Sequence, residues 1–302
     1  MEEKIKTLIE TKFETVKGIS PEWFIRFFDM LESFGVNEDK ISKALDFALS
    51  EQNLNLTQRG NNRNGFDKNS RTTKMLDEFY ALMQRLSKNI KEVKFRKFLE
   101  DSLDYMVAEY EKFDNTSETC FKNLFLKCLV QAFPEEVMLI SGKTKLAEMS
   151  TESDSGTIDL LFGGMTIGDI HFEEVQGDTP LIIFTDLRTL PGLKRMGLGS
   201  YIFKEFCKQV SSYKPGYSVV AWNVMKDKDG SKVYPKWGAH PVKLEVKNDF
   251  WEVDSTPLTE EQTQAFYGDG SRIYYFSPET IALIGMQKNN RYGKECIREK
   301  SM

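Results

Sequence analysis

An apolar run, a glycine-containing loop and an amphipathic stretch follow one another between residues 181 and 211. The run at 181–189 predicts a buried strand, and Ile202, Phe203, Phe206 and Val210 recur at the spacing of one helical face. A strand that enters a helix through a tight loop points the first backbone N–H groups of that helix at one spot, where its dipole favours an anion. The segment therefore predicts a phosphate-binding turn.

The loop itself spans residues 191–200. Gly197 and Gly199 leave room for a diphosphate to approach the backbone, while Lys194 and Arg195 add positive charge beside it. A dinucleotide-binding fold would need a third glycine, but Ser200 and the two residues after it supply none. A phosphate loop of the nucleotide triphosphatases would need Gly-Lys-Ser/Thr, which this segment also lacks.

With its flanking residues, the loop resembles the GNAT superfamily of N-acetyltransferases. The family's strand pattern Leu-x-Val-x-Pro corresponds to Leu187, Thr189 and Pro191, and its pyrophosphate loop corresponds to residues 194–199. The later Asn and the Tyr-x-x-x-Gly motif correspond to Asn223 and to Tyr234 with the glycine four residues on. The resemblance covers residues 155–278, less than half of the chain.

This resemblance implies a function and a set of cofactor-binding residues. The expected reaction is direct attack of a primary amine, of a small molecule or a protein, on the thioester of acetyl-CoA. The resemblance implies that Tyr234 donates a proton to the departing thiolate, and a phenol suits that role because it is protonated at neutral pH. The backbone N–H of Thr189 or its neighbour would polarise the thioester carbonyl. The residues expected to bind acetyl-CoA are Leu187, Thr189, Lys194, Arg195, Met196, Gly197, Leu198, Gly199, Ser200 and Asn223.

The general base is not fixed by the sequence. Many relatives carry Glu six residues before the proline, where this chain has Thr185, and a hydroxyl cannot deprotonate an ammonium group. Strand alternation directs Asp186 to the face opposite Thr185. Glu173 and Asp186 are the favoured candidates, with Glu174 and His171 as alternatives.

The chain also departs from the family pattern. Lys194 stands where Arg or Gln is usual, Thr189 replaces an apolar residue, and Ala239 replaces the usual Phe. Residues 225–230 lengthen the path from Asn223 to Tyr234, and residues 140–157 leave no room for the two helices that the family places there. These departures keep a second hypothesis open, in which a catalytically degenerate domain of this fold binds CoA or docks a partner.

The two halves of the chain differ in pattern. Residues 1–133 show helical periodicity and almost no alternation, whereas residues 134–302 read as strands and helices. We therefore expect an α+β protein, with a helical domain over 1–133 and a GNAT-like mixed central sheet flanked by helices over 134–302. Residues 59–97 carry eleven Lys and Arg and four acids, a net charge of 11 − 4 = +7. This charge suits the solvated face of two helices beside a basic loop. It also suits contact with nucleic acid, with an acidic protein partner of the helical domain or with the 3′-phosphate of the cofactor.

Other features bound the setting. The formal charge of −5 and the pI of 5.4 argue against a nucleic-acid-binding protein. The first residues lack a signal-peptide apolar core, and no apolar run reaches the length of a membrane span. The four cysteines are scattered, without a metal-binding spacing. We expect a cytoplasmic protein without a metal site.

Overall fold

The computed structural model describes residues 7, 11, 22–50, 71–112, 121–141, 155–175, 177–225, 229–247, 250–268, 271–288 and 292. The chain divides into two compact units. The first unit comprises Met1–Glu136 with the short segments Phe162–Met165 and Leu190–Lys194. The second comprises Val137–Leu161, Thr166–Thr189 and Arg195–Met302.

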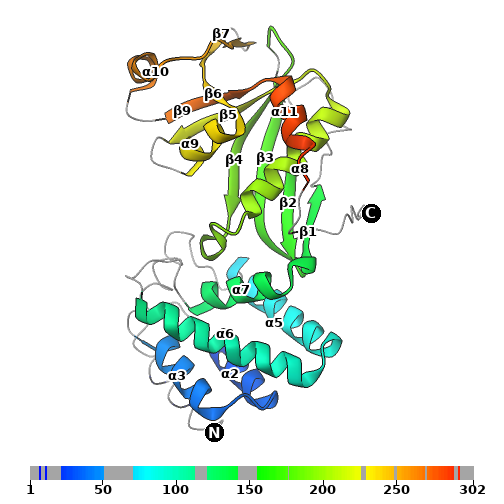
Figure 1. Ribbon diagram of the computed structural model, residues 1–302, viewed down its shortest axis with the longest axis vertical. Coiled ribbons are helices and arrows are strands. Elements are labelled where there is room, and N and C mark those ends of the chain that lie inside the picture. Colours follow the sequence, from blue (N-terminus) through cyan, green and yellow to red (C-terminus); the bar gives the residue numbers. More distant parts are fainter. Residues whose placement is uncertain are drawn as a thin grey trace. The chain divides into compact units, whose positions relative to one another are not determined.

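The first unit is built from helices (Figure 1). They are α2 (Glu22–Ser33), α3 (Glu38–Ala48), α5 (Arg71–Asn89), α6 (Glu92–Lys112) and α7 (Phe121–Ala132). Asn37 caps α3, and its side chain accepts a hydrogen bond from the Asp39 N–H at 2.9 Å. Phenylalanines join α2 to α7 in the core, where the rings of Phe27 and Phe125 meet edge to face at 4.8 Å.

The chain between β4 and α8 contributes a short 3-10 helix, η4 (Pro191–Leu193), to this first unit. A Cβ atom added at Gly192 would lie 2.4 Å from the Cβ of Asn123 in α7. This approach explains why position 192 is glycine. A second 3-10 helix, η2 (Pro134–Glu136), follows α7, and Arg85 of α5 forms an ion pair with Glu136 at 2.6 Å.

A seven-stranded mixed sheet forms the second unit, in the order β1-β2-β3-β4-β5-β9-β6. Its strands are β1 (Val137–Ser141), β2 (Ser155–Phe162), β3 (Met165–Val175), β4 (Leu181–Thr189), β5 (Ser218–Met225), β6 (His240–Pro241) and β9 (Ser271–Phe276). β3 runs antiparallel to β4, β4 runs parallel to β5, and β5 runs antiparallel to β9. The predicted mixed central sheet in an α+β protein is confirmed.

Two helices, α8 (Leu198–Tyr213) and α11 (Pro278–Gly285), lie on one face of the sheet (Figure 1). The helix α8 connects the parallel strands β4 and β5. Aromatic rings pack it against the sheet. The ring centroid of Phe206 lies 5.1 Å from that of Phe172 in β3, and the ring centroid of Phe203 lies 5.4 Å from that of Phe184 in β4. The face of the sheet that carries these contacts is called the α8 face below.

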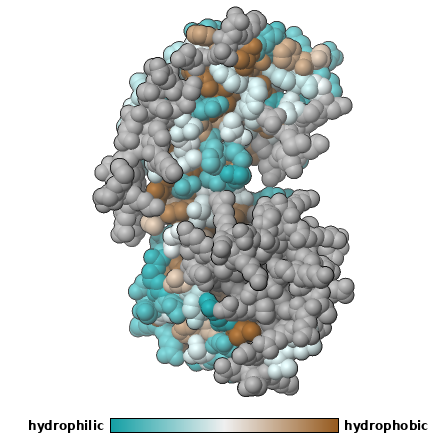
Figure 2. Space-filling model, turned by 180° about the vertical axis from the view of Figure 1, so that it is seen from behind, coloured by the Kyte–Doolittle hydropathy of each residue, from teal (hydrophilic) through white to brown (hydrophobic). Residues whose placement is uncertain are grey.

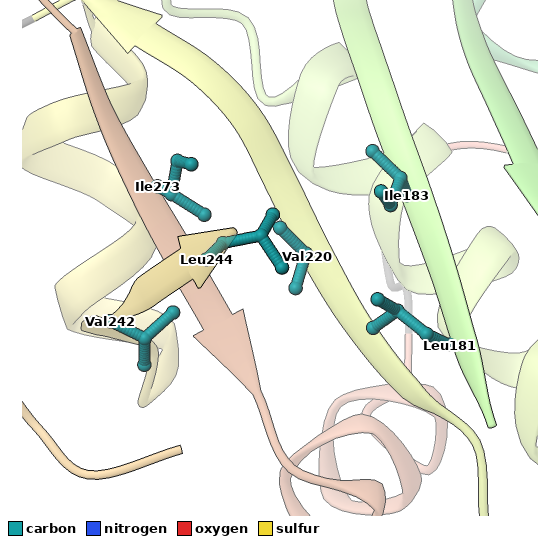
Figure 3. Packing of buried hydrophobic residues seen from close by; sticks show 6 residues of the cluster. All are labelled: Leu181, Ile183, Val220, Val242, Leu244 and Ile273. Atoms are coloured by element: carbon teal, nitrogen blue, oxygen red, sulfur yellow. The ribbon is translucent and has the colours of Figure 1, made fainter. Parts of the chain in front are cut away.

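The opposite face is covered in part by the hairpin of β7 (Lys243–Lys247) and β8 (Phe250–Asp254), near α10 (Glu260–Tyr267). Apolar side chains from β4, β5 and β9 meet those of the hairpin and the residue before it (Figure 3). This cluster consists of Leu181, Ile183, Val220, Val242, Leu244 and Ile273. Burial of these side chains holds the first halves of β4 and β5 together.

Candidate functional site

The strands β4 and β5 are paired at one end and separate at the other. Their parallel register runs from Leu181 opposite Ser218 to Phe184 opposite Ala221 and ends there, although β4 continues to Thr189. We call this divergence after Phe184 and Ala221 the β4–β5 fork. Because alternate N–H and C=O groups of a strand point to each neighbour, the far half of β4 presents backbone groups to the fork that β5 does not pair.

Irregularities in both strands accompany the fork. In β4, His171 of β3 pairs with Asp186 while the next residue, Phe172, pairs with Phe184, so Thr185 is the extra residue of a bulge. In β5, the register with β9 shifts between Ala221 and Val224. Both shifts lie at the level where the two strands part. Thr185 is exposed.

The loop that leaves β4 turns sharply into α8. Arg195 has a φ of 63° and Gly197 has a φ of 85°, and Gly197 is the N-cap residue of the helix. No side chain caps this end, and the Tyr201 N–H makes a hydrogen bond to the Gly197 carbonyl oxygen at 3.0 Å. The N–H groups of the three residues before Tyr201 belong to the first turn, where a helix supplies no backbone acceptor. That this turn binds an anion stays a prediction.

The two glycines of this loop have different reasons to be glycine. Gly197 needs its left-handed backbone conformation, which other residues adopt at a cost. Gly199 lies inside α8 at an ordinary helical φ, and a Cβ atom there would meet no heavy atom within 4 Å. Neither conformation nor packing against the described chain explains Gly199. The missing side chain leaves open space at the first turn of α8.

The other predicted cofactor residues fall around this turn. Lys194 and Arg195 are exposed, Met196 and Leu198 are buried, and Ser200 is half-buried. Leu187 and Thr189, also half-buried, lie on the diverging half of β4. The backbone of Asn223 lies in β5, but its side chain is outside the described part of the structure.

Tyr292 was not among the sequence-predicted residues, yet it contacts this loop. Its hydroxyl donates a hydrogen bond to the Met196 carbonyl oxygen at 2.8 Å, and its ring centroid lies 6.0 Å from that of Tyr201. The contact joins residues 96 positions apart, so no local sequence pattern could have revealed it.

Tyr234 begins the 3-10 helix η5 (Tyr234–Trp237), which follows α9 (Asp229–Val233). Its ring packs against Phe184, the last β4 residue before the fork, at 5.6 Å and against Tyr274 at 5.8 Å. The residue is only 7% exposed, and no described residue makes a hydrogen bond to its hydroxyl. Burial raises the pKa of Tyr234 above its usual value, and the charge of Asp186 adds to the rise. The residue is thus a protonated phenol with an unused donor.

The two favoured base candidates lie on the face opposite α8. Glu173 is paired with Ile183, where β4 still has β5 as its neighbour. Asp186 lies on the half of β4 that diverges from β5. One of its carboxylate oxygens lies 3.1 Å from the guanidinium Nε of Arg188. The view from behind shows hydrophilic and hydrophobic side chains together on the rear of the molecule (Figure 2).

The alternative Glu174 is committed to a buried contact on the α8 face. One of its carboxylate oxygens accepts a hydrogen bond from the Tyr217 hydroxyl at 2.7 Å, and the other lies 2.9 Å from the Lys214 ammonium nitrogen. The residue is 4% exposed. Glu174 therefore ties β3 to the chain after α8 and is not available as a base.

Thiol and metal chemistry have little support among the described residues. Burial raises the pKa of the Cys128 thiol to about 11 and that of Cys207 well above its usual range, so neither is a ready thiolate. Cys120 and Cys296 lie outside the described residues. Within the described ranges, His, Cys, Asp and Glu side chains form no group of three suited to a metal ion. No helix in those ranges is long and apolar enough to cross a membrane.

Comparisons with known proteins give distant structural likenesses. No protein-family model and no curated protein matches the chain. Solved structures of acetyltransferases, one of them described as a member of the GNAT family, match 41% of the chain.

Three of the solved structures illustrate these likenesses. An acetyltransferase from Streptococcus agalactiae is 18% identical over 41% of this chain and 66% of its own, with a TM-score of 0.28. Arabidopsis thaliana Naa50, bound to a bisubstrate analogue that contains CoA, is 13% identical over 40% of this chain and 72% of its own, with a TM-score of 0.29. Malonyl-CoA decarboxylase from Cupriavidus metallidurans is 8% identical over 94% of this chain and 96% of its own, with a TM-score of 0.34. The chain thus spans about two thirds of the first of these proteins.

Proposed function

We propose that the protein is an acyl-CoA-dependent N-acetyltransferase that acetylates a primary amine. The observation that carries this proposal is the β4–β5 fork, which opens directly before an uncapped helix N-terminus. One continuous segment carries backbone groups of β4 that β5 does not pair and, after the loop, the free N–H groups at the start of α8. Such a segment suits a ligand that joins a diphosphate to a carbonyl. This arrangement supports the expected binding of acetyl-CoA.

The loop and the first turn of α8 would hold the diphosphate of acetyl-CoA. The N–H groups of Leu198, Gly199 and Ser200 are available there, and the missing side chain at Gly199 leaves the space. Lys194 and Arg195 are exposed cations at the same turn. Backbone N–H groups of β4 beyond Phe184 would face the thioester carbonyl. When bound, acetyl-CoA supplies the activated acetyl group.

Tyr234 is proposed as the proton donor to the thiolate. A buried tyrosine hydroxyl normally has a hydrogen-bond partner, and this one has none among the described residues. Its raised pKa keeps the hydroxyl protonated over the working pH range. A carboxylate of Glu173 or Asp186 would receive the proton that the amine loses on attack.

Two measurements test this proposal. Acetyl-CoA at millimolar concentration should raise the melting temperature of the full chain, and a panel of amines should then release CoA. Replacing Tyr234 by Phe should lower kcat by about a hundredfold and leave acetyl-CoA binding unchanged, since a general acid typically contributes 10²- to 10⁴-fold. Trp237→Phe, in the same aromatic cluster, is the matched control. Binding without turnover, unaffected by Tyr234→Phe, would favour the CoA-binding or docking module instead.

A further inference from the structure

Four polar residues form a patch on the face of β3 and β4 that is turned away from α8. Asp169 is paired with Arg188 across the two strands, and His171 is paired with Asp186. The residues that flank them on β3 belong to the α8 face, because Phe172 contacts α8 and a Cβ at Gly168 would lie 3.1 Å from Ile202. Strand alternation therefore places Asp169, His171, Asp186 and Arg188 together on the opposite face.

Arg188 organises this patch. Its Nε lies 3.0 Å from Oδ1 of Asp169 and its Nη2 lies 3.3 Å from Oδ2, which makes a two-pronged contact. The same Nε lies 3.1 Å from Asp186, and Nη2 lies 3.1 Å from Nε2 of His171. The Asp169 side chain is only 9% exposed, so this pair fixes the guanidinium in one place.

The charges of the patch do not cancel. Two carboxylates and one guanidinium leave a net charge of −1 when His171 is neutral. Both carboxylate oxygens of Asp169 contact the Arg188 guanidinium. Asp186 is different, because its side chain is 43% exposed and only one of its oxygens faces Arg188 among the described residues. The unused negative charge is therefore on Asp186.

The position of Asp186 sets it apart from Glu173. Glu173 lies opposite Ile183, a member of the apolar cluster under the hairpin, where β4 and β5 are still paired. Asp186 lies on the diverging half of β4, beyond Phe184, and its charge acts on the Tyr234 phenol. Asp186 and Tyr234 therefore both belong to the fork.

We propose that Asp186 binds the ammonium group of a cationic acceptor amine and accepts its proton, with Asp169 and Arg188 as positioning residues. This inference rests on the proposed function. In the reaction the amine nitrogen forms a bond to the acetyl carbon as the carbon–sulfur bond breaks. One ammonium proton passes to the Asp186 carboxylate before the attack. As the adduct collapses, the Tyr234 proton passes to the sulfur, and the second proton lost by the nitrogen restores the Tyr234 phenol.

The same charges specify the class of acceptor. A molecule or side chain with a second positive charge gains from the net negative patch, whereas a carboxylate on the acceptor is repelled by it. The acceptor is thus a diamine-like or basic amine rather than an amino acid. Since Asp186 is partly exposed, salt should weaken this preference.

The test compares three amines of similar length with acetyl-CoA: putrescine, n-pentylamine and γ-aminobutyrate. We expect kcat/KM to fall in that order, with about a fivefold difference between the first two at about 20 mM salt and a smaller one at about 300 mM. Asp186→Asn should remove the preference and raise the KM for putrescine but not for acetyl-CoA. Arg188→Lys should raise the same KM and leave that of acetyl-CoA unchanged. Glu261→Gln, on the exposed side of α10, is the control and should change neither.

Several results would overturn the inference. They are a preference for γ-aminobutyrate, an amine ranking that Asp186→Asn leaves unchanged, and acetyl-CoA binding without acetylation of any of the three amines. Failure of the proposed function looks different, because the chain would then show no saturable binding of acetyl-CoA by calorimetry, or would bind it and release CoA with no amine of the wider panel.

Discussion

The hydroxyl of Tyr292 donates a hydrogen bond to the carbonyl oxygen of Met196, over 2.8 Å. Tyr292 lies after α11 and is 4% exposed, while Met196 lies between the two left-handed residues of the loop that begins α8. The contact therefore joins the end of the described chain to the turn that is proposed to bind a diphosphate.

Replacing Tyr292 by Phe keeps the ring and removes this hydrogen bond. A hydrogen bond of this kind contributes about 1 kcal/mol, so we expect the Kd for acetyl-CoA to rise about fivefold. The value of kcat should change little, because the hydrogen bond that is lost lies in the loop, at Met196. Isothermal titration calorimetry measures the Kd, and Tyr213→Phe, at an exposed position, is the control. Equal affinity of Tyr292→Phe and the unchanged protein would show that the contact does not position the loop.

Alanine at the two loop glycines should have opposite effects on stability. Gly199→Ala enters open space in a helix, so we expect stability to rise by up to about 1 kcal/mol while acetyl-CoA binding weakens. Gly197→Ala forces a left-handed conformation and should lower stability by about 1 to 2 kcal/mol. Thermal melts with and without acetyl-CoA measure both effects. If Gly199→Ala bound acetyl-CoA as tightly as the unchanged chain, the diphosphate would not lie against Gly199.

The buried ion pair of Glu174 and Lys214 should be sensitive to loss of its cation. Lys214→Met leaves a carboxylate that is 4% exposed without its charged partner, which costs about 3 kcal/mol of folding free energy. Urea unfolding of the variant measures this loss. Lys208→Met, whose side chain is 47% exposed, should change stability by less than about 0.5 kcal/mol. Similar losses in both variants would contradict a special role for the buried pair.

The Tyr217 hydrogen bond to Glu174 predicts a pH dependence. It is the main cause that raises the pKa of Tyr217 from 10.0 to about 12 in the folded chain. In the unfolded chain Tyr217 loses its proton first, so its contribution to stability is complete below pH 10 and disappears as the pH rises through about 12. Urea unfolding at several pH values in this window should show a smaller decline for Tyr217→Phe. Equal declines would mean that another group is responsible.

Much of the fold could be predicted from local patterns. The apolar run at 181–189 is β4, and the apolar helical face from Ile202 to Val210 belongs to α8. Asn37 caps α3, a role that its side chain favours. Strand alternation, helical periodicity and glycine at a left-handed N-cap are all properties of short segments, so a single sequence records them.

The site was only partly predictable, because much of it depends on register. Nothing local shows that Asp169 lies opposite Arg188, or that a bulge at Thr185 shifts which residues share a face. The sequence left Glu173, Asp186, Glu174 and His171 as possible bases. In the structure, Glu174 contacts Lys214 and Tyr217. Of the two favoured candidates, Asp186 lies beyond the last β4 residue that pairs with β5, and Glu173 does not.

The most direct test of the central claim is calorimetric titration of the full chain with acetyl-CoA. An acetyl-CoA-dependent enzyme should bind one equivalent with a Kd between about 1 μM and 1 mM, the usual range of substrate affinities. Gly199→Val, which fills the open space at the start of α8, should abolish this binding while the fold remains intact. No saturable binding to the unchanged chain at millimolar acetyl-CoA would contradict the account.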